Sequence, residues 1–220
     1  MAAARKDPPA VPVKRGRPVG SGAGRAPLDG KRSRDQEVVE AAIRLFSDKG
    51  YAATSVQDLA DELGMLKGSL YYYIDTKETL LKRIFETSHQ EVSEIAERYR
   101  VDEGPALERL RSFLEEYALW YATHLQRASL FAREWRYASD ELRGVMAQQR
   151  KYYDEVLREF ILAAQEEGEI RAELDVKLAT YFVMSAVSSL PDWFKPRGRQ
   201  SAKHVVSEYA RMAINLLVAS

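Results

Sequence analysis

The sequence predicts an all-α protein of nine helices, on three observations. From Ser33 onward the apolar residues recur at intervals of three and four, the period of an amphipathic helix. The pattern [ST]-x-x-Q, which caps helix N-termini by reciprocal hydrogen bonds, occurs at Ser33 and again at Thr54. No stretch has the features of a β-strand bounded by turns.

Residues 33–100 are expected to form four helices. The apolar positions predict helices over 33–50, 54–64, about 66–73 and from 76 to about 100. Glycine ends the first two, as is common where a helix closes in the left-handed conformation. The second and third helices, joined by a three-residue turn, form a helix-turn-helix.

The remainder of the chain is also expected to be helical. Apolar stripes predict helices over about 105–123, 125–137, 141–167 and 175–190, and Gly168 is expected to end the third of these. A loop over 191–198 then separates these helices from a final apolar helix.

Residues 1–32 differ from the rest in composition and charge. The whole chain has 33 Lys+Arg and 33 Asp+Glu, yet residues 1–34 hold nine basic and two acidic residues, a net charge of +7. Rich in Pro, Gly and Ala, the segment 1–32 lacks the large apolar side chains that would offset its ordering entropy. We therefore expect a disordered basic arm.

The arm contains Arg15-Gly16-Arg17-Pro18, which resembles the core of an AT-hook. A narrow A·T minor groove has a negative potential that attracts arginine, so Arg15 and Arg17 are candidate DNA contacts. The alternative is a solvated tail that adds only non-specific affinity.

Several classes of protein are disfavoured. The chain has no Cys and three widely separated His, so neither a disulfide nor a metal site is expected. It has no G-x-S-x-G, H-E-x-x-H or P-loop motif, so it is not expected to be an enzyme or to hold a cofactor. No apolar run is long enough to span a membrane and no secretory signal is visible, which favours a cytoplasmic protein.

The short third helix has the composition of a DNA-reading surface. If Leu70 and Ile74 point inward, polar and aromatic side chains face out. Three consecutive tyrosines usually pack in a core or interface, but so short a helix can bury only one of them. Lysine, serine and tyrosine suit phosphates and base edges. The outward residues are Lys67, Ser69, Tyr71, Tyr72 and Tyr73.

Residues 34–85 resemble the DNA-binding domain of the TetR family of bacterial transcriptional regulators. This implies a helix-turn-helix domain over 33–83 and a helical ligand-binding and dimerisation domain over 84–220. The motif residues are Phe46, Gly50, Tyr51, Thr54, Ser55, Val56, Leu59, Ala60, Gly64, Met65, Gly68, Ser69, Leu70, Tyr71, Tyr73, Ile74, Lys77 and Leu80.

The resemblance implies roles for individual residues. Phosphate contacts are implied for Thr54, Tyr73 and Lys77, and base contacts for the start of the recognition helix. Two positions depart from the family pattern, because Leu66 replaces a common Ser and Gln57 a common Arg. The full set of expected DNA contacts in this domain is Thr54, Gln57, Lys67, Gly68, Ser69, Tyr71, Tyr72, Tyr73 and Lys77.

Family members dimerise by packing their last two helices into a four-helix bundle. The apolar character of the last two helices here fits this arrangement, and a monomeric core covered by other helices is the alternative. The expected interface residues are Tyr181, Ser185, Trp193, Phe194, Tyr209 and Leu216.

The central helices are where the family builds its ligand pocket. The loop 193–198 is similar to that of a subgroup whose effectors are acyl-coenzyme A thioesters, although Met184 and Ser188 stand where some of its members have Arg and Trp. An aromatic stripe is otherwise typical of a core. The expected ligand-binding residues are Trp120, Tyr121, Phe131, Trp135, Tyr153, Met184 and Ser188.

The resemblance thus predicts a homodimeric repressor in the bacterial cytoplasm, associated with the nucleoid. It would bind a palindromic operator in double-stranded DNA and be released by a small-molecule effector, with an acyl-coenzyme A thioester as the implied class and no membrane partner. An alternative is an architectural DNA-binding protein that uses the basic arm and senses no ligand.

Overall fold

A computed structural model describes residues 28–218 of the chain, with side chains from Arg34 onward. Within this range the fold is all-α, as predicted, without a β-strand. The helices are α1 (Leu28–Lys49), α2 (Val56–Glu62), α3 (Lys67–Leu70), α4 (Lys77–Arg100), α5 (Ala106–Thr123), α6 (Leu125–Glu134), α7 (Asp140–Glu166), α8 (Val176–Ser188), α9 (Leu190–Trp193) and α10 (Ala202–Leu217), with a 3₁₀ turn η1 (Trp135–Tyr137).

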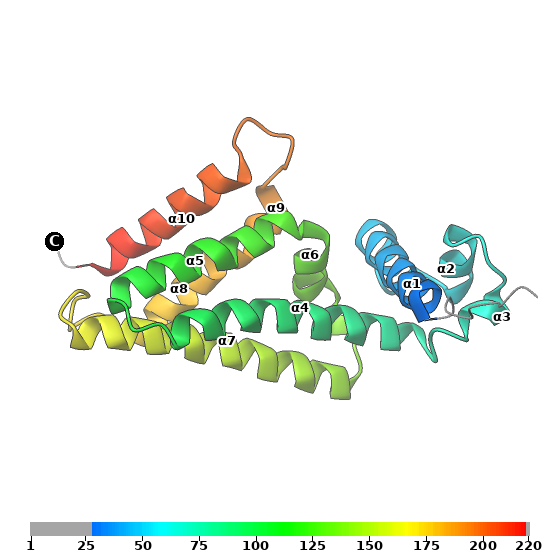
Figure 1. The fold of residues 1–220 in the computed structure, drawn as a ribbon, viewed down its shortest axis with the longest axis horizontal. Coiled ribbons are helices and arrows are strands. Elements are labelled where there is room, and N and C mark those ends of the chain that lie inside the picture. Colours follow the sequence, from blue (N-terminus) through cyan, green and yellow to red (C-terminus); the bar gives the residue numbers. More distant parts are fainter. Residues whose placement is uncertain (1–27, 219–220) are drawn as a thin grey trace, which may run out of the picture.

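The molecule is elongated, with two parts joined by α4 (Figure 1). We call α1–α3 with the first turns of α4 the head, and the remaining helices the body. From the head, α4 runs into the body, where it packs against α5 and α7. In the body α5 is central, because it contacts α4, α7, α8 and α10.

The buried hydrophobic residues form two cores: one lies in the body, and the other joins the head to residues of α6 and the start of α7. Leu80 and Ile84 of α4 are buried in the head core with residues of α1, α2 and α3. Two turns later Val92 and Ala96 of the same helix are buried in the body core. The two parts also touch outside α4, because α6 packs against α1.

The nine predicted helices are present in the described residues, and their glycine ends are as expected. Gly50, Gly64 and Gly168 have φ angles of 86°, 60° and 78°, the left-handed region in which a residue without Cβ is unstrained. The 3₁₀ turn η1 and the one-turn helix α9 are additions, since α9 occupies the start of a segment predicted as a loop.

Two helix boundaries differ from the prediction. Helix α1 begins at Leu28 instead of Ser33, so its first residues belong to the segment predicted as disordered. The capping pattern at Ser33 lies inside the helix, and nothing between 28 and 33 is a proline that would interrupt it. Helix α3 is shorter than expected, since residues 71–73 form turns after Leu70. Aromatic residues lose rotamer freedom in a helix, and three in succession favour this early end.

In the described part of the chain no helix has both the length and the apolar character that crossing a membrane requires.

Candidate functional site

The turn and the short helix α3 form one face of the head. Leu70 and Ile74 are buried in the head core, as predicted, and this fixes which side of α3 points outward. Tyr73 is half-buried and packs against the same core, so it is less available than expected. We call the exposed residues the recognition surface: Leu66, Lys67, Gly68, Ser69, Tyr71 and Tyr72.

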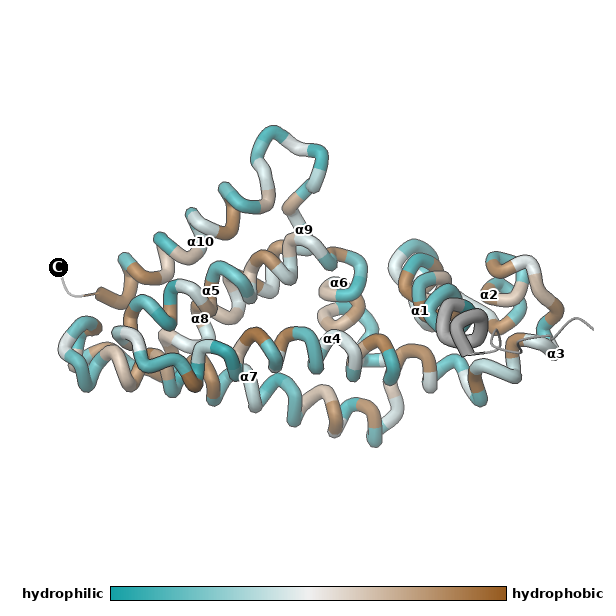
Figure 2. Tube along the Cα trace, viewed as in Figure 1, coloured by the Kyte–Doolittle hydropathy of each residue, from teal (hydrophilic) through white to brown (hydrophobic). Residues whose placement is uncertain are grey.

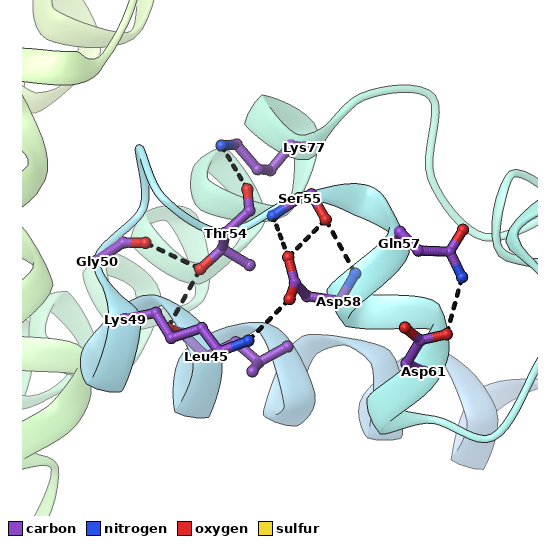
Figure 3. Close-up of polar contacts among 9 residues, drawn as sticks. All are labelled: Leu45, Lys49, Gly50, Thr54, Ser55, Gln57, Asp58, Asp61 and Lys77. Atoms are coloured by element: carbon purple, nitrogen blue, oxygen red, sulfur yellow. Dashed lines mark hydrogen bonds and ion pairs between the residues drawn. The ribbon is translucent and has the colours of Figure 1, made fainter.

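Ser55 caps the N-terminus of α2, where the sequence predicted Thr54. Its side chain accepts a hydrogen bond from the Asp58 amide, and the Asp58 carboxylate accepts one from the Ser55 amide at 2.7 Å. Lys49 donates to the same carboxylate at 2.7 Å (Figure 3). The hydrogen bonds from Lys49 and Ser55 hold the pKa of Asp58 well below its ordinary value.

Thr54 has a structural position, and the phosphate contact implied for it stays a prediction. Its side chain is only 1% exposed, and its hydroxyl donates to the Gly50 carbonyl at 2.8 Å (Figure 3). The Leu45 carbonyl lies 3.3 Å from the same hydroxyl. The Thr54 side chain ties the end of α1 to the start of α2 and does not reach the outer face.

Lys77 is also used inside the head. Its ammonium donates to the carbonyls of Tyr51 and Thr54, both at 2.7 Å, and lies 4.3 Å from the centre of the Tyr51 ring. Burial lowers the pKa of Lys77, and the charge of Glu134 opposes this shift. Two of the three ammonium donors therefore have partners within the protein, and the phosphate contact implied for Lys77 stays a prediction.

Gln57 remains on the surface. Its side-chain amide donates to Asp61 Oδ1 at 2.8 Å, one turn along α2 (Figure 3). Gln57 points away from the cluster of Ser55 and Asp58, so it is placed on the exposed side of the motif. A contact to a base would have to compete with Asp61.

A buried carboxylate lies where the body meets the head. Glu134 ends α6, is buried, and has one oxygen, Oε2, without a hydrogen-bond partner. Its other oxygen faces Gly50, 3.8 Å from the position a Cβ would take there. The negative charge of Glu134 also acts to raise the pKa of Lys77, which favours the charged ammonium. Glu134 therefore connects the body to the loop that Lys77 binds.

The body contains a polar cluster between α4, α5 and α6. Arg127 donates two hydrogen bonds to Glu91, at 2.9 and 2.8 Å, and the Trp120 indole donates a third at 2.8 Å. The guanidinium of Arg127 lies 5.3 Å from the Trp120 ring, and His124 stacks on that ring. Burial alone would raise the pKa of Glu91, but these hydrogen bonds outweigh it and lower the pKa.

A group of hydroxyls lies nearby, between α4, α5 and α7. The Tyr153 hydroxyl donates to the His89 carbonyl at 3.0 Å and lies 2.6 Å from His89 Nδ1. Tyr117 and Tyr121 are joined through their hydroxyls at 3.2 Å. Burial raises the pKa of all three tyrosines, so they are neutral donors. On α7, Gln149 is buried with an unpartnered Oε1.

The predicted ligand-binding residues do not form one group. Trp120, Tyr121 and Tyr153 lie among the polar and aromatic side chains just described. Phe131 instead packs on Phe85 at the head core, with ring centres 4.2 Å apart, because α6 turns towards α1.

The other three predicted ligand residues lie elsewhere. Trp135 is exposed in η1 and Ser188 is exposed on α8, while Met184 packs against the body core. Sequence reasoning missed Glu91, Arg127, His89, Tyr117 and Gln149, whose contacts join distant parts of the chain without a local motif.

One face of α8 and α10 exposes apolar side chains, and we call it the α8–α10 face. Figure 2 shows hydrophobic positions recurring along α10. Of the predicted interface residues, Tyr181, Ser185 and Leu216 are exposed, and Trp193 stacks on half-buried Tyr209. A groove between the two helices is lined by Phe182, Val183, Tyr209, Met212 and Leu216, among others.

Phe194 does not belong to this face. It is 6% exposed and packs in the body core, because its amide closes the single turn of α9 on the Leu190 carbonyl and directs the chain inward. The sequence prediction missed this turn. Phe182 and Met212 are exposed on the face and were not predicted.

The predicted DNA contacts of the basic arm have no structural counterpart. Arg15 and Arg17 lie outside the described residues. Between residues 28 and 218, no cluster of three or more His, Cys, Asp or Glu side chains is placed to bind a metal ion.

Comparison with known proteins assigns the fold to a family. The family "Bacterial regulatory proteins, tetR family" matches residues 38–84, and "Tetracyclin repressor-like, C-terminal domain" matches residues 103–217. The chain is 30% identical over 192 residues to the HTH-type transcriptional repressor KstR2 of Mycobacterium tuberculosis, covering 83% of this chain and 92% of the relative.

Solved structures agree with this result. The ketosteroid transcriptional regulator KstR2 of Mycobacterium tuberculosis superposes with a TM-score of 0.80 at 24% identity, covering 85% of this chain and 96% of that one. AibR, solved with isovaleryl coenzyme A and operator DNA, superposes with a TM-score of 0.72 at 26% identity, covering 84% and 98%. The chain belongs to the TetR family of bacterial transcriptional regulators.

Proposed function

We propose that this protein is an effector-responsive transcriptional repressor that binds a palindromic operator as a homodimer. The observation that carries the proposal is the recognition surface, which Leu70 and Ile74 hold outward at the end of the head. Its exposed lysine, serine and tyrosines have the donors and acceptors that contact phosphates and base edges. The relative KstR2 is named as a transcriptional repressor.

The homodimer forms through the α8–α10 face. An exposed apolar face of this kind is typical of a protein–protein interface. Packing two copies about a two-fold axis buries Phe182, Met212 and Leu216 on both copies, and places two heads for two half-sites. In this arrangement the protein acts on DNA in the bacterial cytoplasm.

The effector is an acyl-coenzyme A thioester bound in the body. AibR, with 26% identity, was solved with isovaleryl coenzyme A, which supports this class. The interior between α4, α5 and α7 supplies aromatic rings for an acyl chain and neutral hydroxyls for its carbonyl. Gln149, buried with a free oxygen, adds an acceptor for a ligand donor.

The basic arm supplies long-range attraction to DNA. Residues 35–83 hold six basic and nine acidic residues, so the head itself is acidic, whereas residues 1–34 carry +7. Since non-specific DNA binding depends on phosphate neutralisation, the arm compensates for the head. The alternative, an architectural protein without a ligand, rests on this same arm.

The test combines thermal unfolding with operator binding. We expect an acyl-coenzyme A series to raise Tm in a concentration-dependent way, because bound ligand stabilises the native state. The same compounds should weaken operator binding, and the operator should weaken their binding by an equal factor. Free coenzyme A and the free acids are the ligand controls.

Matched variants locate the site. Trp120→Phe removes the indole donor to Glu91 and should reduce the ligand response, whereas Trp135→Phe changes an exposed residue and should not. If no acyl-coenzyme A of any length shifts Tm or releases DNA, the thioester assignment is wrong. If no ligand of any class does so while DNA still binds, the architectural alternative holds.

A further inference from the structure

Leu66 is the most exposed large hydrophobic residue in the described part of the chain, with 79% of its surface accessible. It occupies the N-cap position of α3, at the leading edge of the recognition surface. Leu70 and Ile74 complete the packing of this segment against the head core, and half-buried Met65 packs beside them. Leu66 itself is not part of that core.

The stability of the head does not account for leucine at this position. An N-cap serine, threonine, aspartate or asparagine would accept a hydrogen bond from a free amide of the first turn. Leu66 makes no such bond, so the helix has lost a cap and the surface has gained an exposed aliphatic group. Both features are unfavourable for the isolated protein and favour a role in contact with a partner.

The backbone holds Leu66 in one place. Its φ and ψ angles are −69° and 141°, and its carbonyl accepts hydrogen bonds from the Ser69 amide at 2.9 Å and the Leu70 amide at 3.2 Å. Since Leu70 is anchored in the core, the Cβ of Leu66 has a fixed position at the start of α3. The neighbouring exposed side chains, Lys67 and Ser69, are polar.

We propose that Leu66 reads thymine through its 5-methyl group, a specificity contact that rests on the proposed function as an operator-binding protein. In the major groove the edges of base pairs present donors, acceptors and a single apolar group, the methyl of thymine. An aliphatic side chain cannot form hydrogen bonds with the donors or acceptors. Its only favourable contact in the groove is with the thymine methyl. Each half-site therefore carries a thymine beneath the start of α3.

The test removes that methyl without changing any hydrogen bond. An operator is first selected from random duplexes with the full-length wild-type protein, and each thymine is then replaced in turn by deoxyuridine. Burial of one methyl group corresponds to about a fourfold change in affinity. We expect one position in each half-site to weaken wild-type binding by about fourfold, and the symmetric double replacement by about 15-fold.

The variant Leu66→Ala should bind the thymine and deoxyuridine operators equally at that position. Leu66→Ser should do the same and raise Tm by a few degrees, because it restores a helix cap. Val101→Ala, at an exposed valine that ends α4, is the control and should keep the full deoxyuridine penalty.

The outcomes separate the two proposals. If wild-type protein selects no duplex, operator binding fails and the role of Leu66 fails with it. If wild-type protein binds but tolerates deoxyuridine at every position, or if Leu66→Ala keeps the same penalty, operator binding stands and the methyl contact is wrong.

Discussion

The recognition surface and the α8–α10 face both expose hydrophobic side chains, but in different patterns. In the head, Leu66 and Tyr72 are exposed among Lys67 and Ser69, so apolar and polar groups are interleaved. In the body, Phe182, Met212 and Leu216 line one apolar groove. An interleaved surface matches a partner that itself varies from group to group, such as the edges of base pairs. A continuous apolar face matches another apolar face.

Breaking the α8–α10 face should have the largest effect. Phe182→Glu puts a carboxylate into the groove between α8 and α10, at a side chain that is 61% exposed in the single chain. In the proposed dimer both charges would be buried unpaired, at a cost of several kcal/mol each. We expect the dimer dissociation constant, measured by sedimentation equilibrium, to rise about a hundredfold or more.

The matched control for this change is Val101→Glu, which adds the same charge at an exposed valine that ends α4. It should leave the dimer intact. A Phe182→Glu protein that remains dimeric at nanomolar concentration would show that the two copies meet elsewhere.

Two lysines of the head, Lys77 and Lys67, should respond differently to replacement. Lys77→Met removes donors from the carbonyls of Tyr51 and Thr54, so we expect the free energy of unfolding to fall by about 1–3 kcal/mol. Lys67→Met, on the recognition surface, should keep its Tm and change base preference instead. Denaturant unfolding and operator binding, measured on both variants, distinguish these effects.

An unchanged stability for Lys77→Met would argue against the structural role. If operator binding by that variant also lost about one unit of salt slope, the phosphate contact implied by the family resemblance would be supported for Lys77.

The smallest expected effect is on the pH dependence of stability, and it comes from His89 in the interior of the body. Burial lowers the pKa of His89 below its ordinary value of 6.5, so the unfolded chain takes up the proton first as the pH falls. The stability that His89 contributes is present above pH 6.5 and is lost as the pH falls through its folded-state pKa.

This effect is measured as the slope of unfolding free energy against pH below that value. His89→Gln should flatten the slope, whereas His204→Gln, which removes an exposed imidazole, should keep it. If both variants follow the wild-type curve, His89 does not govern this part of the pH dependence.

The sequence was sufficient to predict those features of the structure that depend on residues close together along the chain. The helical period and the closing glycines at 50, 64 and 168 predicted the helices, and the spacing of Leu70 and Ile74 predicted which side of α3 faces out. These features depend on residues within two turns of each other.

The sequence was insufficient where two neighbouring residues could serve equally well as a helix cap, or where the residues in contact are far apart along the chain. Thr54 and Ser55 are both good caps, and only the carbonyls of Leu45 and Gly50 decide which of the two is buried. Lys77 finds its acceptors 26 and 23 residues away, and Arg127 pairs with Glu91 across 36 residues. No periodic pattern encodes such contacts.

The lysine that joins Tyr51 and Thr54 to the first turn of α4 also affects how the molecule can move. Because Lys77 binds the α1–α2 loop, it fastens this loop to the first turn of α4, so that a shift of α4 is passed to the head. At 1.5 Å per residue, the 24 residues of α4 span about 36 Å. A tilt of about 5° at the body end therefore carries the head about 3 Å, close to the rise of one base pair.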